Sequence, residues 1–148
     1  MSSWKQLVAN GDVVAHSTSK KEISNLLSVV KRDLQDASIS GLSADRQFAT
    51  AYNAALQLCK IAIGCCGYRV TSKNHHQQSF EIAKVAVGKN VEPLTDYFEL
   101  CRRKRNKLDY DLANVVTLTE AAELMKKTIE FQTLVMAWVK SDHPSLLP

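Results

Sequence analysis

Apolar residues recur along this chain at alternating intervals of three and four positions, the spacing of one face of an α-helix. The two clearest stripes are Ile23, Leu26, Leu27, Val30, Leu34 and Ala37, and Phe48, Tyr52, Ala55, Leu58, Cys59 and Ala62. Glycine and proline, which interrupt helices, number only 5 and 3 among 148 residues. No segment alternates apolar and polar residues over a useful length. The sequence therefore predicts an all-α fold.

Capping signals and glycines divide the chain. Ser19 with Glu22, and Thr117 with Glu120, have the spacing of a capping box, in which a hydroxyl and a carboxylate satisfy backbone amides at a helix start. A short helix over 4–14 is expected within an N-terminal arm, 1–18, and a frayed tail over 142–148. The expected helices between them run from Ser19 to before Gly41, from Ser43 to about Gly67, from about His75 to Gly88, from near Pro93 through a basic run, and onward from Thr117. Residues 68–74 and 109–116 are expected to be loops, which makes the domain an antiparallel bundle of four to five helices.

A chain of this length forms one domain with a sizeable core and needs no metal or disulfide to fold. Its four cysteines lie in or beside apolar stripes, as buried thiols do in a reducing compartment. Cys65 and Cys66 with His75 and His76 suggest a zinc site as an alternative, but their spacing matches no usual ligand pattern. We therefore expect no metal and no cofactor.

The N-terminus has no charged leader followed by an apolar region, and no window reaches the length of a membrane span. We therefore expect a cytoplasmic protein without a membrane partner. The net charge of +4 is too small to indicate nucleic-acid binding by itself. Its distribution is uneven, however, because five of the six residues over 102–107 are basic.

Arg105, within this basic run, occupies a position where helix periodicity predicts a buried apolar residue. The stripe that contains it is Val91, Leu94, Phe98, Cys101, Arg105, Leu108 and Leu112. An inward guanidinium stays protonated, so it needs an acid, backbone carbonyls or an anionic ligand as partner. Two alternatives stay open: a long stem along the core edge with its head in water, and a helix that ends before Arg105. Part of the run also complements the helix dipole.

Three segments together are similar to the HEPN superfamily of small helical domains. They are 51–58 followed by Gly67, Tyr68 and Arg69, then 97–111, and then the helix opened by Thr117. The resemblance covers about residues 19–141. It implies a homodimer in which two Arg-centred motifs face each other across a cleft for RNA. Arg105 matches the family's Arg and Asn106 the polar residue that often follows it.

Tyr110 stands where catalytic members of the family have a histidine. Histidine exchanges protons near neutral pH, with an unperturbed pKa of about 6.5, whereas tyrosine at about 10 does so poorly. The substitution predicts weak or absent metal-independent RNA cleavage, although a phenol still bonds phosphate or stacks on a base. His75 and His76 offer an imidazole from elsewhere, and Tyr68 and Arg69 an aromatic face and a cation; ordinary surface roles are the alternative for all four.

Two functions follow from these observations. The first is an RNA-binding protein, with weak endoribonuclease activity as a further expectation, that belongs to a toxin or defence system and has an antitoxin or nucleotidyltransferase partner. In it, Arg105, Asn106 and Tyr110 form the centre, and the surrounding cations attract phosphates: Arg102, Arg103, Lys104 and Lys107. The second is a non-catalytic dimeric module that binds another protein, with Arg105 paired to Asp109 or Asp111.

Overall fold

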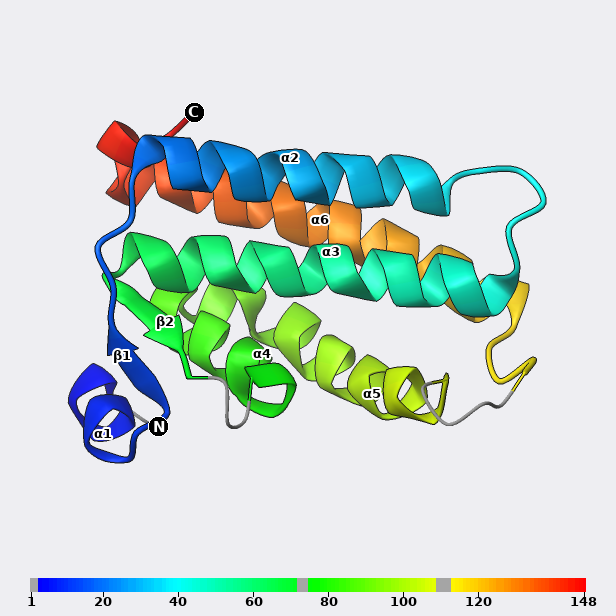
Figure 1. Cartoon of the computed structure of the whole chain (residues 1–148), viewed down its shortest axis with the longest axis horizontal. Helices are drawn as coiled ribbons and strands as arrows, with labels where there is room; N and C mark the ends of the chain where they lie inside the picture. Colours follow the sequence, from blue (N-terminus) through cyan, green and yellow to red (C-terminus); the bar gives the residue numbers. More distant parts are fainter. Residues whose placement is uncertain (1–2, 72–74, 109–112) are drawn as a thin grey trace.

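The computed structural model describes residues 3–71, 75–108 and 113–148. Its elements, in chain order, are α1 (Trp4–Ala9), β1 (Val13–Ala15), α2 (Lys20–Ala37), α3 (Ala44–Cys65), β2 (Tyr68–Val70), α4 (His75–Val87), the 3-10 turn η2 (Lys89–Val91), α5 (Glu92–Leu108), α6 (Leu118–Asp142) and the 3-10 turn η3 (Pro144–Leu146) (Figure 1). The fold is an all-α helical bundle with one small two-stranded ribbon, as the periodicity predicted.

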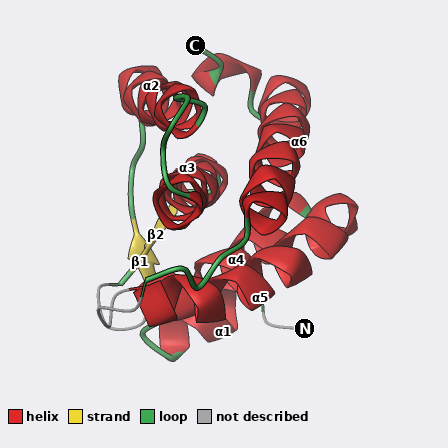
Figure 2. Cartoon of the chain, turned by 90° about the vertical axis from the view of Figure 1, so that its right-hand side faces the viewer, coloured by secondary structure: helices red, strands yellow, loops and turns green. Residues whose placement is uncertain are grey.

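α3 is the central helix of the bundle. It packs against α2, α4, α5, α6 and β2, and the end view in Figure 2 shows it between α2 and α6 with α4 and α5 beneath. Thirteen of its 22 residues are buried. A helix that is apolar on nearly all sides can lie only inside a protein, and the alanines of α3 allow its neighbours to approach closely. The remaining helices therefore form a shell around α3.

An aromatic cluster joins this shell to α3. The ring centroids of Phe80 on α4 and Phe98 on α5 lie 5.2 Å apart, and those of Phe98 and Phe131 on α6 lie 5.1 Å apart. Tyr52 on α3 meets Phe80 edge-on at 5.7 Å. These spacings are within the favourable range for aromatic pairs, so the first half of α5 is packed against the aromatic core.

Only one of the two predicted capping boxes is complete in the structure. At α6 the box is complete, because the Thr117 hydroxyl accepts from the Glu120 amide at 3.0 Å and the Glu120 carboxylate accepts from the Thr117 amide at 3.0 Å. At α2 the Ser19 hydroxyl accepts from the Glu22 amide at 3.1 Å, but the Glu22 carboxylate instead accepts from Thr18 and His16. The predicted hydrogen bond between the Ser19 amide and the Glu22 carboxylate is therefore wrong, while the hydrogen bond between the Glu22 amide and the Ser19 hydroxyl is as predicted.

The N-terminal arm also differs from expectation. α1 ends at Ala9, and β1 pairs antiparallel with β2, so that Val13 lies opposite Val70 and Ala15 opposite Tyr68. The predicted helix over 4–14 is too long, and the predicted loop over 68–74 begins with a strand. Three-residue strands are too short to show a period of two, and the pairing depends on residues distant in sequence.

The C-terminal tail, which the sequence predicted to be frayed, carries regular structure. α6 continues to Asp142, and Pro144 opens the turn η3, where its fixed φ suits a first helical position. Leu146 and Leu147 pack against the core, so apolar burial holds the tail. None of the described helices is both long enough and apolar enough to cross a membrane.

Gly64 and Gly67 offer a matched pair of tests of this packing. Gly64 lies inside α3, and a Cβ there would contact Thr18 at 3.8 Å, an ordinary van der Waals distance. Gly64→Ala should therefore stabilise the protein by about 0.5–1 kcal/mol through helix propensity. Gly67 has φ +90°, so Gly67→Ala should destabilise by about 1 kcal/mol. Urea unfolding measures both, and equal effects of the two substitutions would contradict this account.

Candidate nucleic-acid interface on α5

The basic run lies on the last turns of α5, which continues to Leu108. The alternative that the helix ends before Arg105 is therefore excluded. Cys101 is buried and Arg105 half-buried, whereas Arg103 and Asn106 are exposed. The apolar stripe of α5 thus continues into Arg105. The basic residues beside Arg105 differ in their solvent exposure.

Arg105 lies close to Tyr52 of α3. The Nε atom of Arg105 is buried, and Tyr52 itself is only 1% exposed. Burial raises the pKa of the Tyr52 phenol far above its ordinary value, and the positive charges of Arg102 and Arg105 partly oppose that rise. The Arg105 side chain is therefore partly enclosed by the protein, while part of the residue stays open to solvent.

Glu99 is a member of this cluster that the sequence analysis missed. Its Oε2 lies 3.4 Å from Nε of Arg102, and its Oε1 is buried without a hydrogen-bond partner among the described residues. Burial raises the pKa of this carboxyl, and Arg102 partly offsets the rise. The spacing of three residues between Glu99 and Arg102 on one helix was the available signal.

Lys104 is directed away from this cluster. It forms an ion pair with Glu120, the residue that also completes the capping box of α6. Its charge therefore joins the end of α5 to the start of α6. This pairing reduces the attraction that Lys104 can offer to a phosphate.

Asp45 fixes the chain that follows α5. Its two carboxylate oxygens accept from the backbone amides of Asn114, at 2.7 Å, and Val116, at 3.0 Å. Asn114 has φ 58°, a left-handed conformation that asparagine tolerates better than most residues. A carboxylate in the first turn of α3 thus anchors the connection that leads into α6, and the sequence alone gave no sign of it.

Several predicted residues lie outside what the structure describes. Tyr110 belongs to the segment 109–112, as do the acids proposed to pair with Arg105, and the side chains of His75, His76 and Lys107 are also not described. Their roles stay predictions from the sequence.

Tyr68 and Arg69 are not brought together with the basic turns of α5. Both lie on β2, at the opposite end of the bundle from the C-terminus of α5 (Figure 1). The Tyr68 ring is stacked on Trp4, with centroids 4.5 Å apart and planes within 10°, so one of its faces is already covered. Arg69 is exposed and lines a separate pocket.

The remaining surface and thiols show no metal centre. The four cysteines are unpaired, and burial raises the pKa of Cys65 and of Cys101 to about 11, so both stay protonated thiols at neutral pH. No three His, Cys, Asp or Glu side chains in the described parts of the chain are placed to hold a metal.

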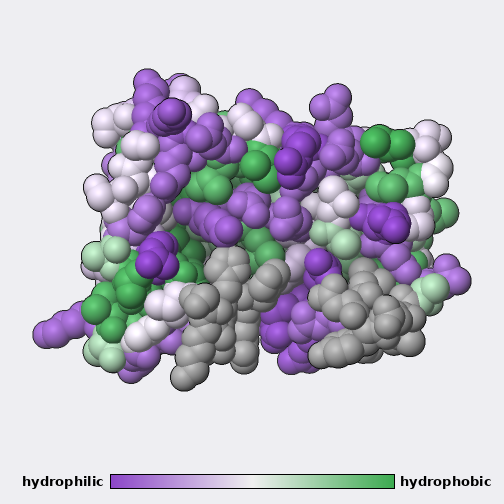
Figure 3. Space-filling model, viewed as in Figure 1, coloured by the Kyte–Doolittle hydropathy of each residue, from purple (hydrophilic) through white to green (hydrophobic). Residues whose placement is uncertain are grey.

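Figure 3 shows a mainly hydrophilic face, with hydrophobic residues gathered over the β1–β2 ribbon at its left.

Comparison of the chain with protein-family models, with curated proteins and with solved structures gives no match. The likeness to HEPN domains therefore stays a prediction that rests on the segments 51–58 and 97–111 and on the helix opened by Thr117.

Asp45 provides a test of how the site is held. Asp45→Ala should cost about 1–3 kcal/mol of unfolding free energy, because two backbone amides lose a charged acceptor, and Asp45→Asn should cost less. Hydrogen exchange should accelerate at the amides of Asn114 and Val116. Asp36→Ala, at an exposed position of α2, is the control and should leave both amides protected. Unchanged exchange in Asp45→Ala would refute the anchoring role.

Proposed function

We propose that this protein binds the phosphate backbone of RNA through the last turns of α5. The observation that carries the proposal is the placement of Arg105, which is half-buried beside Tyr52. Residues three and four positions apart share a helix face, so Arg102, Arg105 and Asn106 present two guanidinium groups and an amide on one side of α5. Phosphate is recognised by such groups.

An arginine in this position suits an oriented phosphate contact. Its planar guanidinium presents donors in a fixed fork that matches two phosphate oxygens, and it keeps its charge at any physiological pH. Partial burial of the side chain restricts its movement before a ligand binds. Less conformational entropy is then lost on binding than for a mobile surface lysine.

The local charge balance predicts modest affinity. Within the described segment, Glu99 offsets Arg102 and Glu120 offsets Lys104, whereas Arg103 makes no ion pair with a described residue. Two or three phosphate contacts on a single strand give a slope of log affinity against log salt of about −1.4 to −2.1. Binding should therefore weaken as the salt concentration rises.

The likeness to HEPN domains extends the proposal to a homodimer, with the α5 motifs of two copies facing one cleft, in a cytoplasmic toxin or defence system with an antitoxin or nucleotidyltransferase partner. Tyr110 in place of histidine makes cleavage weak or absent. Tyr68 and Arg69 are left out of the proposed RNA surface because they lie at the other end of α3.

A second function is favoured by one specific observation. Leu100 on α5 is 63% exposed and lines a cleft of about 100 Å³ with Phe48 and Tyr97. Lys104, Glu120 and Glu123 also line this cleft, and an apolar patch with a polar rim is one form that a protein-binding surface takes. A protein-interaction module that uses this face is therefore the alternative to RNA binding.

Substitutions along α5 test RNA binding. Arg105→Gln should weaken binding of a fluorescein-labelled single-stranded RNA about tenfold or more, because a charge-assisted contact is lost. Arg103→Gln should weaken it only a few-fold and make the salt slope shallower. Arg105→Lys should keep the salt slope and lose affinity, because charge is retained without the fork. Fluorescence anisotropy over a salt series measures each variant.

Lys31→Gln, at an exposed position of α2, is the matched control and should bind like the parent protein. Circular dichroism melting establishes that each variant is folded. Wild-type affinity in Arg105→Gln combined with loss in Arg103→Gln would leave only a general surface patch. If no RNA binds at low salt, the interaction module is favoured, and light scattering with Leu100→Ser then tests for a self-associating face.

Cleavage, where detectable, should be weak and insensitive to EDTA. Tyr110→His should raise it, because imidazole exchanges protons near pH 7, and Tyr110→Phe should not. The measurement is gel analysis of structured and single-stranded RNA, with Arg105→Gln as the control for contaminating nuclease. Robust magnesium-dependent hydrolysis that survives Arg105→Gln would show that the proposed chemistry is wrong.

A further inference from the structure

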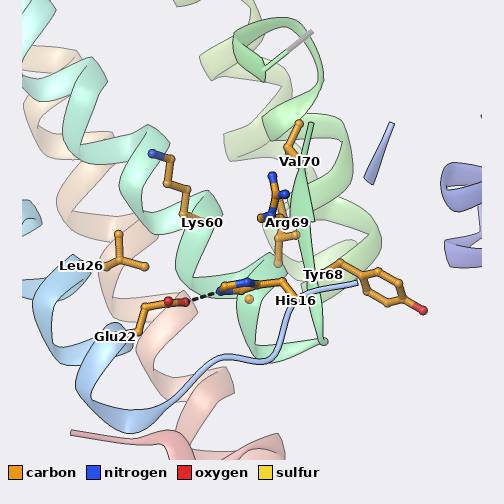
Figure 4. A pocket seen from close by; sticks show the side chains of 9 residues that line it. His16, Glu22, Leu26, Lys60, Tyr68, Arg69 and Val70 are labelled. Carbon is orange, nitrogen blue, oxygen red and sulfur yellow. Dashed lines mark hydrogen bonds and ion pairs between the residues drawn. The ribbon is translucent and has the colours of Figure 1, made fainter. Parts of the chain in front are cut away.

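A separate pocket of about 350 Å³ lies between the start of α2, the C-terminal half of α3 and β2 (Figure 4). This volume is within the range of small-molecule sites in proteins. Lys60 on its wall lies eight residues along α3 from Tyr52, a rise of about 12 Å. The pocket is thus distinct from the basic turns of α5.

One wall of the pocket carries a fixed polar pair. Nε2 of His16 lies 2.7 Å from Oε1 of Glu22, and the Thr18 hydroxyl donates to the same oxygen at 2.7 Å. These hydrogen bonds lower the pKa of Glu22, so the carboxylate is ionised and accepts from the imidazole N–H. The His16 ring is thereby held in the wall, and much of the acidic charge of Glu22 is already engaged.

Two cations stand on the other side of the pocket. Figure 4 shows Lys60, from α3, and Arg69, from β2, both lying away from the His16–Glu22 pair. Both residues are exposed, and neither forms an ion pair with any residue that the structure describes. Two cations that line one pocket make its electrostatic potential positive and attract an anion.

The floor of the pocket is apolar. Leu26 and the buried Ile63 line it, together with Gly64. These aliphatic side chains can cover the apolar part of a ligand and remove it from water, which favours binding. Apolar walls with few placed polar groups are the usual make-up of a ligand site.

We propose that this pocket binds a small organic anion, with a carboxylate or phosphate head between Lys60 and Arg69 and an apolar body against Leu26 and Ile63. His16, held by Glu22, offers its remaining ring nitrogen to a polar edge of the same ligand.

The test uses two anions and their neutral counterparts on the ¹⁵N-labelled full chain. Indole-3-acetate carries a carboxylate and adenosine monophosphate a phosphate; indole-3-acetamide and adenosine are their uncharged matches. At least one anion should shift the amide resonances of Gly64 and Val70 at millimolar concentration or below. Its neutral counterpart should bind roughly tenfold more weakly or worse. The anion that binds identifies the head group.

The double variant Lys60→Gln/Arg69→Gln should weaken binding of that anion roughly tenfold or more. Lys31→Gln/Lys140→Gln, which removes two exposed cations elsewhere, should bind like the parent chain. Absence of shifts with both anions would overturn the proposal. So would equal binding of a neutral counterpart, or unchanged affinity in the Lys60→Gln/Arg69→Gln variant when its spectrum shows it folded.

Discussion

The burial of α3 on nearly all sides is the constraint on which the rest of the structure depends. A central helix must be covered in every direction, and α2, α4, α5 and α6 are arranged around it to do so. Its N-terminal half carries Tyr52, whose phenol is influenced by the charge of Arg105. Its C-terminal half supplies Lys60, Ile63 and Gly64 to the pocket. Both proposed sites therefore lie against the same well-packed helix.

The cluster of Glu99, Arg102 and Arg105 on α5 has charged side chains at partly buried positions, where apolar side chains would pack without a desolvation cost. Arg105 interrupts an apolar stripe, and Glu99 is buried enough for its pKa to rise despite the neighbouring Arg102. Buried ionic groups of this kind contribute little to stability, because desolvation offsets most of the attraction between them.

Sequence periodicity predicted the long helices, the complete box at Thr117 and the register that puts Arg105 after Cys101, because each depends on residues within a few positions of one another. It missed the pairing of Val13 with Val70 and the anchoring of Asn114 by Asp45, since both join residues far apart in the chain. The contact of Glu22 with His16 was missed for a different reason, because both residues are close in sequence and two local hydrogen-bonding arrangements competed for one carboxylate. The pocket was invisible in the sequence because its walls come from three separate segments.

The two carboxylate oxygens of Glu120 have separate partners. Oε1 accepts from the Thr117 amide, while Oε2 pairs with Lys104. An anion that bound Lys104 would compete with Oε2 for the ammonium group and would leave Oε1 on the Thr117 amide. The ion pair between α5 and α6 could then be replaced by a pair with the ligand while the capping box of α6 stayed in place.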